Sequence, residues 1–413
     1  MGIIKEKYML SSRRETVALS ASAVKSVRFV DARKCGYRVS DGRHIGIFGV
    51  AGNATPEQEA WKRAEENLAN RIPYSVQPSA NRSEHVDVSG GVLSEKEFKE
   101  AAESFAETLK KRFPGFLFGN DISREEEEVR LVNDVGLDLS YKTAYYTVSL
   151  LMSDKNSAGL FDLGYEYAGR EFDIEKMCAD IAELERAYRT PADIGEGEHI
   201  VFSSPYDLGF GKLVEGILAD SYANGTGLFA EKRGEQVFDD RVSLYEDRNP
   251  ETTLGVPFFD AEGDVRDGYR NYVFRNGVFV SPVASESDAV KYRLPATGSA
   301  IAEYDGVPTT GIVNLKPESS GKTMRQLTAG EEAIYLVMAS GGDTTPDGNF
   351  ATPVQTAFLW RDGKFVGKLP TLGISGNLFD LYGKNYLGLA EDSLSHTDCK
   401  SCHPLAVRMT VRK

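Results

Sequence analysis

The sequence has few side chains of the kinds that most often bind transition metals. Its 413 residues include five histidines and four cysteines, and the histidines are His44, His85, His199, His396 and His403. None of these spacings matches HExxH or HExxxH, in which two histidines on one helix hold zinc and the glutamate is the general base. The usual zinc-peptidase motif is therefore absent, and four cysteines in a chain of this length exclude a disulfide scaffold.

Long apolar runs and an excess of positive charge are also lacking. The N-terminal segment has no uninterrupted apolar region, and no run of about 18 apolar residues follows it. We therefore expect neither a signal peptide nor a membrane span, and a cytoplasmic location. The formal net charge is −14. Because affinity for nucleic acids comes largely from Lys and Arg that neutralise phosphates, we expect no direct nucleic-acid partner.

Signatures of several other enzyme classes are missing too. The chain contains no GxSxG nucleophile motif, no P-loop and no dinucleotide-binding glycine pattern. What it does contain is the composition of an ordinary soluble globular protein, with 41% hydrophobic and 27% charged residues. Its length is sufficient for at least two domains, each with a core of its own.

The first half of the chain combines patterns of strands and helices. Alternating apolar and polar residues predict a half-buried antiparallel hairpin, with strands over residues 16–20, 24–30, 36–39 and 45–48. One helix is predicted to begin after Thr55 as its N-cap, and a second after the capping box of Ser94 and Glu97. The passage between these helices, residues 73–91, is predicted as a loop.

Three further expectations concern the rest of this half. The acidic run Arg124–Glu128 is predicted as a solvated turn or edge. A third helix is predicted from Asp173 to Thr190, where apolar residues recur at helical spacing. The proline and glycine passage that follows marks the expected domain boundary, which gives two domains over residues 1–193 and 194–413.

Strand and turn patterns dominate the second half. Asn276-Gly277 and Asp362-Gly363 each separate two apolar runs, which is a strong hairpin signal. One helix stands out, with apolar residues recurring at helical spacing from Phe210 to Leu218 and a left-handed stop near Gly225. We therefore predict the α+β class, with an α/β N-terminal domain and a β-rich C-terminal domain that has one central helix.

A series of short motifs after this helix resembles a known family. The order of these motifs is similar to that in the TldD/TldE (PmbA) proteins, often labelled modulators of DNA gyrase and grouped with the metallopeptidases. The motifs are Gly225-Thr226, Gly234-Glu235, Pro257-Phe258, Glu262-Gly263 and Ile374–Leu378. The resemblance is detailed over roughly the last half of the chain and present only in outline before it. It implies a two-domain α+β fold, in agreement with the prediction above.

The resemblance also implies which residues would hold a metal. The catalytic branch of the family carries HExxxH on the central helix. Counting back from Gly225-Thr226, the corresponding positions here hold Phe210, Gly211 and Glu215. The chain therefore resembles the TldE branch, which lacks the metal motif. We expect no cofactor in this chain, whereas a TldD-like partner would carry zinc.

A second group of candidate ligands lies near the C-terminus, where His396, Cys399, Cys402 and His403 stand within eight residues. CxxCH is the attachment motif of c-type haem, which we disfavour because the chain shows no export signal. Two thiols and two imidazoles also suit tetrahedral zinc. In the family's catalytic branch, a cysteine at the place of Cys399 helps to hold zinc. Without the two helix histidines, we interpret Cys399 as a buried structural residue.

Four carboxylates form a further cluster that partly matches the family's Asp-x-Glu-Gly signature. These residues are Asp260, Glu262, Asp264 and Asp267. Paired carboxylates can transfer protons or bind a cation. The glycines at 263 and 268 indicate tight turns, so we favour solvated acids in turns.

Three hypotheses about function follow, and whether the chain is itself an enzyme stays open at this stage. The first, carried over from the resemblance, is a non-catalytic TldE-like subunit of a cytosolic metallopeptidase complex. Its partner would bear HExxxH, and the complex would process unfolded peptides bound mainly through main-chain hydrogen bonds. The second is a self-sufficient metallohydrolase with zinc on Glu215, Cys399 and His403. The third is a homodimer that binds peptides without cutting them.

Overall fold

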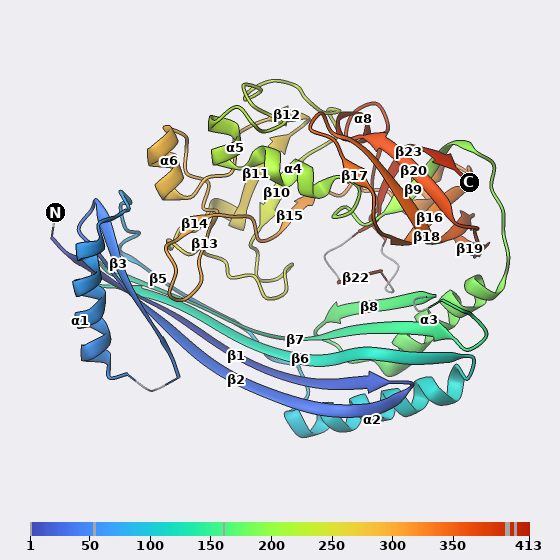
Figure 1. The fold of residues 1–413 in the computed structure, drawn as a ribbon, viewed down its shortest axis with the longest axis horizontal. Coiled ribbons are helices and arrows are strands. Elements are labelled where there is room, and N and C mark those ends of the chain that lie inside the picture. The colour runs from blue at the N-terminus through green and yellow to red at the C-terminus, as the bar shows by residue number, and fades with distance from the viewer. Residues whose placement is uncertain (1, 53–54, 160–161, 393–396, 400–402) are drawn as a thin grey trace.

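Four very long strands form the basis of the first half of the chain (Figure 1). The computed structural model describes residues 2–52, 55–159, 162–392, 397–399 and 403–413. The long strands pair antiparallel in the spatial order β7-β6-β1-β2. They are β1 (Ile4–Ser20), β2 (Ala23–Ser40), β6 (Phe116–Asn133) and β7 (Leu137–Asp154). Together they form a curved sheet whose concave face is directed at the second half of the chain.

Shorter strands complete this sheet of nine strands. They are β3 (His44–Ala51), β4 (Ile72–Pro73), β5 (Arg82–Val88), β8 (Leu163–Gly169) and β22 (Thr397–Cys399). β22 comes from the other end of the chain and pairs parallel with β8. β5 lies inside the passage predicted as a loop, and that prediction is wrong. β5 pairs parallel with β7, and a partner so distant in sequence leaves no local signal.

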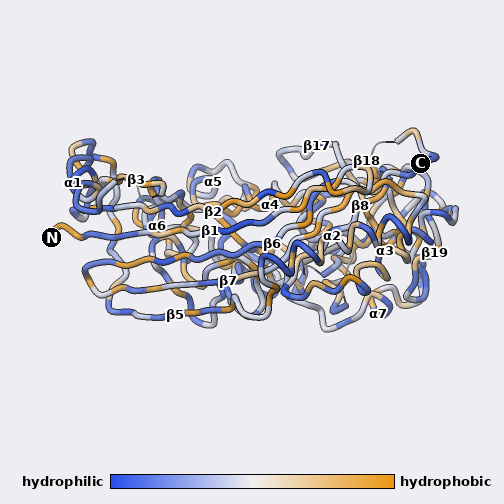
Figure 2. Tube along the Cα trace, turned by 90° about the horizontal axis from the view of Figure 1, so that it is seen from below, coloured by the Kyte–Doolittle hydropathy of each residue, from blue (hydrophilic) through white to orange (hydrophobic). Residues whose placement is uncertain are grey.

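Three helices pack against the strands of this half (Figure 1). They are α1 (Glu57–Asn67), α2 (Glu95–Arg112) and α3 (Ile174–Arg189). The capping box of Ser94 and Glu97 is confirmed, but Thr55 does not cap α1, because Pro56 occupies the N-cap and makes no side-chain bond. Figure 2 shows hydrophobic and hydrophilic residues alternating along α2, as expected of a helix with one buried face.

The acidic run Arg124–Glu128 is not a solvated turn. It lies within β6, between β1 and β7 in the middle of the sheet. Glu125 is buried and accepts a hydrogen bond of 2.5 Å from Arg14 on β1, while Arg124 donates to the carbonyl of Leu93. The prediction was wrong because the partners that neutralise these charges stand on neighbouring strands and cannot be read from the local sequence.

The second half contains a sheet of eight strands in which five close into a ring. The ring has the order β16-β9-β23-β20-β18 and is closed by pairing between β16 and β18. Its members are β9 (Gly197–Ser203), β16 (Ala333–Ala339), β18 (Asn349–Arg361), β20 (Leu372–Asn377) and β23 (Leu405–Arg412). The other strands are β17 (Asp343–Thr344), β19 (Lys364–Lys368) and β21 (Tyr386–Leu389).

Smaller elements surround this ring. A sheet of four strands contains β10 (Leu244–Asp247), β11 (Arg270–Arg275), β12 (Val278–Phe279) and β15 (Leu315–Pro317). A sheet of two strands contains β13 (Ala300–Ile301) and β14 (Thr309–Thr310). Three short helices are α6 (Glu286–Tyr292), α7 (Met324–Thr328) and α8 (Leu378–Leu381). The hairpins predicted at Asn276-Gly277 and Asp362-Gly363 are confirmed, and all four residues have positive φ. The α+β class is also confirmed.

The predicted central helix is interrupted. α4 (Phe210–Ile217) and α5 (Ala219–Ala223) are separated by Leu218, whose ψ of 142° is extended. The break is stabilised by an exchange of main-chain bonds with Val283, which donates to the carbonyl of Ile217 and accepts from Ala219. Helical spacing alone could not reveal this, because the main-chain partner of the break, Val283, lies far along the chain.

One hydrophobic core links the two halves of the chain. Phe98 on α2 and Ile181 on α3 belong to the same buried cluster as Phe202 on β9 and Trp360 on β18. The division into domains at residues 193 and 194 stays a prediction. Within the described residues, no helix is long and apolar enough to cross a membrane.

Candidate functional site

α4 contains the positions at which the catalytic branch of the resembled family carries its metal-binding motif. Two side chains of this helix line a cavity. The helix follows β9 through a turn in which Leu208 and Gly209 have φ of 49° and 84°. Leu213 is fully buried in the core of the second half. Phe210 and Val214 are only partly buried and line the cavity.

This α4 cavity has a volume of about 530 Å³. Its walls come from α4 and the turn before it, from the concave face of the long sheet, and from residues 253–256 and 312–315. The lining is mainly apolar and comprises Tyr145, Ala168, Tyr206, Phe210, Val214, Thr253, Leu254, Val256, Ile312, Val313, Asn314 and Leu315. A cavity of this size is large enough for a side chain or a short peptide segment.

Acidic groups stand on the sheet beside the α4 cavity. Glu127 lies on β6 and its pKa is raised by burial and by the neighbouring carboxylate of Glu125. The pKa of Tyr145 is likewise raised by burial and by Glu127, so the phenol stays protonated. The cavity therefore presents apolar surface and neutral hydroxyl groups rather than free cations.

The residues at the expected metal positions of α4 do not form a zinc site. The ring of Phe210 packs edge-on against Tyr206, with 5.2 Å between the ring centroids. Gly211 is exposed and offers no donor side chain. Glu215 is half exposed and accepts a hydrogen bond of 2.9 Å from Lys212 Nζ. An aromatic ring, a hydrogen and one solvent-facing carboxylate do not fit the nitrogen and sulfur donors that zinc prefers.

The C-terminal candidates are described only in part. His396 and Cys402 lie outside the described residues. The backbone of Cys399 on β22 pairs with Ala168 of β8, which lines the α4 cavity. His403 is partly buried, and its Nδ1 is buried without a hydrogen-bond partner in the part of the chain that is described. Among the described residues, no group of three or more His, Cys, Asp or Glu side chains could hold a metal ion.

The carboxylates at 260 and 262 are not solvated, which corrects the expectation for this cluster. The turns themselves are as predicted, since Gly263 and Gly268 have φ of 77° and 63°. Asp260, however, is 2% exposed and accepts three main-chain hydrogen bonds, each 2.9 Å long, from Glu262 N, Asp264 N and Ala300 N. The carboxylate accepts the hydrogen bonds that these main-chain N–H groups would otherwise donate to water, so its role is structural. Spacing gave no indication of this burial.

Glu262 connects this loop to the first half of the chain. Its Oε1 accepts a hydrogen bond from the Tyr74 hydroxyl at 3.1 Å, and its Oε2 accepts one from Glu286 N at 2.7 Å. Next to it, Arg38 of β2 donates to the Ala261 carbonyl at 2.7 Å. Burial and the nearby charge of Asp260 raise the pKa of Glu262 to about 8. We call this group, Asp260 and Glu262 with Tyr74 and Arg38, the carboxylate junction.

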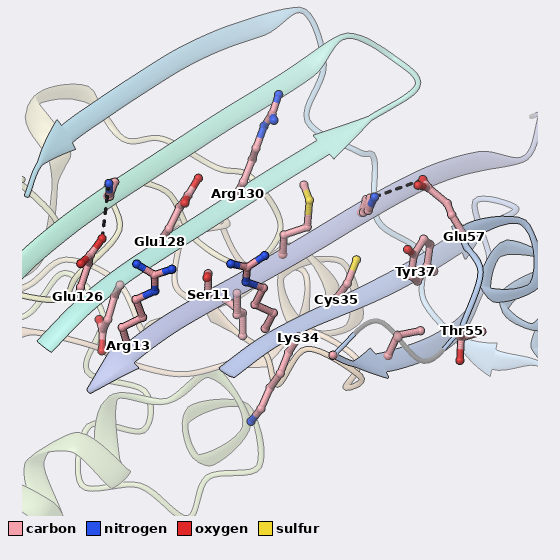
Figure 3. A pocket seen from close by; sticks show the side chains of 18 residues that line it. Ser11, Arg13, Lys34, Cys35, Tyr37, Thr55, Glu57, Glu126, Glu128 and Arg130 are labelled. Atoms are coloured by element: carbon pink, nitrogen blue, oxygen red, sulfur yellow. Dashed lines mark ion pairs between the residues drawn. The ribbon is translucent and has the colours of Figure 1, made fainter. Parts of the chain in front are cut away.

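A larger cavity of about 700 Å³ lies on the opposite, convex face of the sheet, beside the start of α1 (Figure 3). Its lining is rich in charges of both signs, and two ion pairs lie among the lining residues. Lys7 pairs with Glu57 at 3.2 Å, and Lys142 pairs with Glu126 at 3.6 Å. The pKa of the Cys35 thiol at this cavity is raised by burial, which disfavours the reactive thiolate. Burial therefore does not activate the thiol of Cys35 in the convex cavity.

Sequence reasoning missed most of the α4 cavity. Tyr145 and Ala168 come from strands of the first half, and nothing in their local sequence indicates that they face α4. A weak signal existed in the second half. The motif Pro257-Phe258 and the segment at Asn314-Leu315 both lie in or next to loops that line the cavity.

Comparisons with known proteins agree with this geometry. The family model of the PmbA/TldA metallopeptidase C-terminal domain matches residues 206–413. An uncharacterized protein of Methanocaldococcus jannaschii is 23% identical over 63% of this chain and 62% of its own length. The zinc metalloprotease TldD homolog of Saccharolobus solfataricus is 23% identical over 50% of this chain and 47% of its own length. The matches thus span less than two thirds of these relatives.

Solved structures resemble the whole fold. TldE from Thermococcus kodakarensis aligns with a TM-score of 0.81 and 17% identity, covering 99% of this chain and 96% of that one. A putative modulator of a DNA gyrase from Thermotoga maritima aligns with a TM-score of 0.80 and 18% identity, covering 100% and 96%. At such identities the likeness establishes the fold alone. Since the family model covers residues 206–413, half of its length, the chain belongs to the PmbA/TldD metallopeptidase family.

Proposed function

We propose that this chain is a TldE-like, non-catalytic subunit of a cytoplasmic TldD/TldE-type metallopeptidase complex. The observation that carries the proposal is the composition of α4. The positions of the family's metal motif hold Phe210, Gly211 and Glu215, and the helix presents Phe210 and Val214 to an apolar cavity instead of metal ligands. The metal and the general base would be supplied by a partner subunit that bears HExxxH.

The role of this chain in such a complex is to hold peptide. An unfolded segment has free main-chain groups and exposed apolar side chains, and the α4 cavity offers apolar surface for the latter. The cavity lies between α4 and the concave face of the sheet, near the short strand β22. Binding that depends on the main chain and on general apolar contact tolerates varied sequences, as a peptide-processing complex requires.

The proposal is tested by reconstitution with an HExxxH-bearing relative from the same organism. Each chain is purified alone, and cleavage of unfolded peptides is measured for each chain and for the mixture. We expect cleavage in the mixture and none with this chain alone. Replacing the motif glutamate of the partner by glutamine should abolish the activity of the mixture. Cleavage by this chain alone would overturn the proposal.

The peptide-holding role has a separate test at the cavity. Phe210→Ala removes an aromatic ring that packs edge-on against Tyr206 and borders the cavity. We expect peptide affinity to fall at least about tenfold, since loss of apolar contact with one large side chain is worth roughly 1.5–3 kcal/mol. The matched control is Val290→Ala, which shortens a side chain that is 54% exposed on α6. Equal peptide affinity in both variants and the parent would place the peptide elsewhere.

A second candidate function is a self-sufficient metallohydrolase. Two observations favour it. The buried Nδ1 of His403 has no hydrogen-bond partner among the described residues, and the backbone of Cys399 pairs with Ala168 beside the α4 cavity. The discriminating measurement is the zinc content of the purified chain, before and after Cys399→Ser. Stoichiometric zinc that disappears in the variant would favour this candidate, and a parent chain without zinc would reject it.

A further inference from the structure

One long margin of the nine-stranded sheet is open. β2 pairs with β1 along its whole length, but on its other side β3 pairs only with residues 34–40. Among the described residues, no strand covers residues 23–33, which we call the β2 edge. In Figure 1 this edge forms the lower margin of the sheet. Unpaired main-chain groups along a strand are a template for another strand.

The β2 edge also exposes apolar side chains. Val24, Val27, Phe29 and Val30 are between 37% and 54% exposed, and Phe29 is the most exposed of them. The edge contains no proline that would remove a donor. Side chains alternate along a strand, so Val27 and Phe29 lie on the same face, opposite Val17 and Glu15 of β1. An exposed apolar edge of this length is typical of an interaction surface.

The edge is held rigidly by its hairpin. Ala21 and Ser22 form the turn between β1 and β2, with φ of 50° and 62°. Ser22 N donates to the Phe118 carbonyl at 2.8 Å, and Phe118 N donates to Ser22 Oγ at 3.0 Å. Because the tip is fastened to β6, a partner strand would meet main-chain groups that are already ordered. Binding then costs little conformational entropy on this side.

The pairing at the end of β3 shows which residues of the β2 edge direct their main-chain N–H and C=O groups away from β1. The carbonyl of Arg33 accepts a hydrogen bond of 2.7 Å from Gly52 N on the open side of β2. Successive residues of a strand direct their main-chain groups to alternate sides. Val27, Phe29 and Asp31 are in phase with Arg33, so their N–H and C=O groups also point to the open side.

We propose that the β2 edge pairs antiparallel with the β2 edge of a second copy of this chain, about a two-fold axis at Arg28. This register places Val27 opposite Phe29 of the other copy, twice by symmetry, and these are the residues whose main-chain groups are free. It also brings the Lys25 end of one strand to the Asp31 end of the other. The two Arg28 side chains meet near the axis, but each has the Asp121 carboxylate 3.8 Å away.

This dimer goes beyond the proposed function and uses a different surface. In the strand order of the sheet, β8 and β22 stand at one margin and β2 lies on the far side of β7, β6 and β1. The α4 cavity is lined from β7 and β8. Pairing through the β2 edge therefore leaves the cavity accessible, and it would double whatever assembly forms around α4.

The oligomeric state gives the first test. The purified full-length chain is examined by sedimentation velocity over a range of concentrations, together with Phe29→Lys and Val290→Lys. Both substituted side chains are 54% exposed, so neither change should affect folding. We expect a dimer for the parent and for Val290→Lys, and at least a tenfold weaker dimer for Phe29→Lys. A parent that is monomeric throughout, or equal behaviour of the two variants, would overturn the proposal.

Cross-linking tests the register. At a non-hydrogen-bonded antiparallel pair, Cα atoms are about 4.5 Å apart, which suits a disulfide. Arg28→Cys on the axis should thus form a disulfide-linked dimer under mild oxidation. Ser26→Cys on the same edge would be about 14 Å from its symmetry mate, too far for a bond. Equal cross-linking of both variants, or a cross-link of Arg28→Cys that forms only with an HExxxH-bearing relative, would overturn the pairing of two copies.

Discussion

The α4 cavity and the carboxylate junction show opposite relations between sequence and chemistry. At α4, the positions that bear the family's metal motif hold Phe210, Gly211 and Glu215, and the surroundings are apolar. At the junction, carboxylates of a kind that often perform acid-base chemistry are buried and saturated with hydrogen bonds. At the junction, a raised pKa therefore marks buried carboxylates that hold the loop in place, whereas the metal-motif positions of α4 carry a single carboxylate, Glu215, which is half exposed.

The largest effect should come from removing the carboxylate of Asp260. Asp260→Ala leaves three main-chain N–H groups without their acceptor in a buried loop. Each unsatisfied buried donor costs about 1–3 kcal/mol, so we expect the free energy of unfolding to fall by at least about 3 kcal/mol. Urea unfolding followed by circular dichroism measures the loss.

Asp267→Ala is the matched control, because it removes an exposed carboxylate from the same cluster. Its expected effect is within about 0.5 kcal/mol. An equal loss of stability in the two variants would mean that the buried and the exposed carboxylate contribute equally to the fold. The contrast between the buried junction and a solvated acidic turn would then be wrong.

A smaller, pH-dependent effect is expected at Glu262. Its pKa is raised to about 8 in the folded protein by burial and by Asp260, from a reference value of 4.5. Between these two pH values the folded state keeps a proton that the unfolded state releases. The stabilisation is thus complete below about pH 4.5 and is lost as pH rises through 8, by up to about 1.4 kcal/mol per pH unit.

Glu262→Gln should remove this component, because the amide is uncharged at every pH and resembles the protonated acid. Relative to the parent, the variant should gain stability between pH 5 and pH 8, as measured by urea midpoints at several pH values. Asp267→Asn, in which the replaced acid is exposed, should keep the slope of the parent. Parallel profiles for Glu262→Gln and the parent would show that Glu262 is ionised in the fold.

The difference between the two regions also explains how far the sequence could be interpreted. Local signals performed well: the capping box at Ser94, the hairpins at Asn276 and Asp362 and the family motifs are all confirmed. Features that depend on distant partners were missed. Glu125 is neutralised by Arg14 on a neighbouring strand, and the Asp260 carboxylate accepts a hydrogen bond from Ala300 of β13.

The candidate site followed the same rule. The composition of α4 could be counted from the sequence, because the HExxxH spacing is local to one helix. The cavity that faces Phe210 could not, since Tyr145 and Val313 reach it from strands and loops far along the chain. Sequence spacing identifies what a helix can offer to a ligand, whereas the fold decides what surrounds it.

The smallest effect is expected at Glu215, and it tests the α4 side of the comparison. Its carboxylate is half exposed and pairs with Lys212 at 2.9 Å. Surface pairs of this kind contribute little, so Glu215→Ala should change the free energy of unfolding by no more than about 0.5 kcal/mol. Zinc content and peptide affinity should equal those of the parent. A loss of bound zinc in this variant would instead make Glu215 a ligand, and α4 would then retain the metal chemistry that its other two positions have lost.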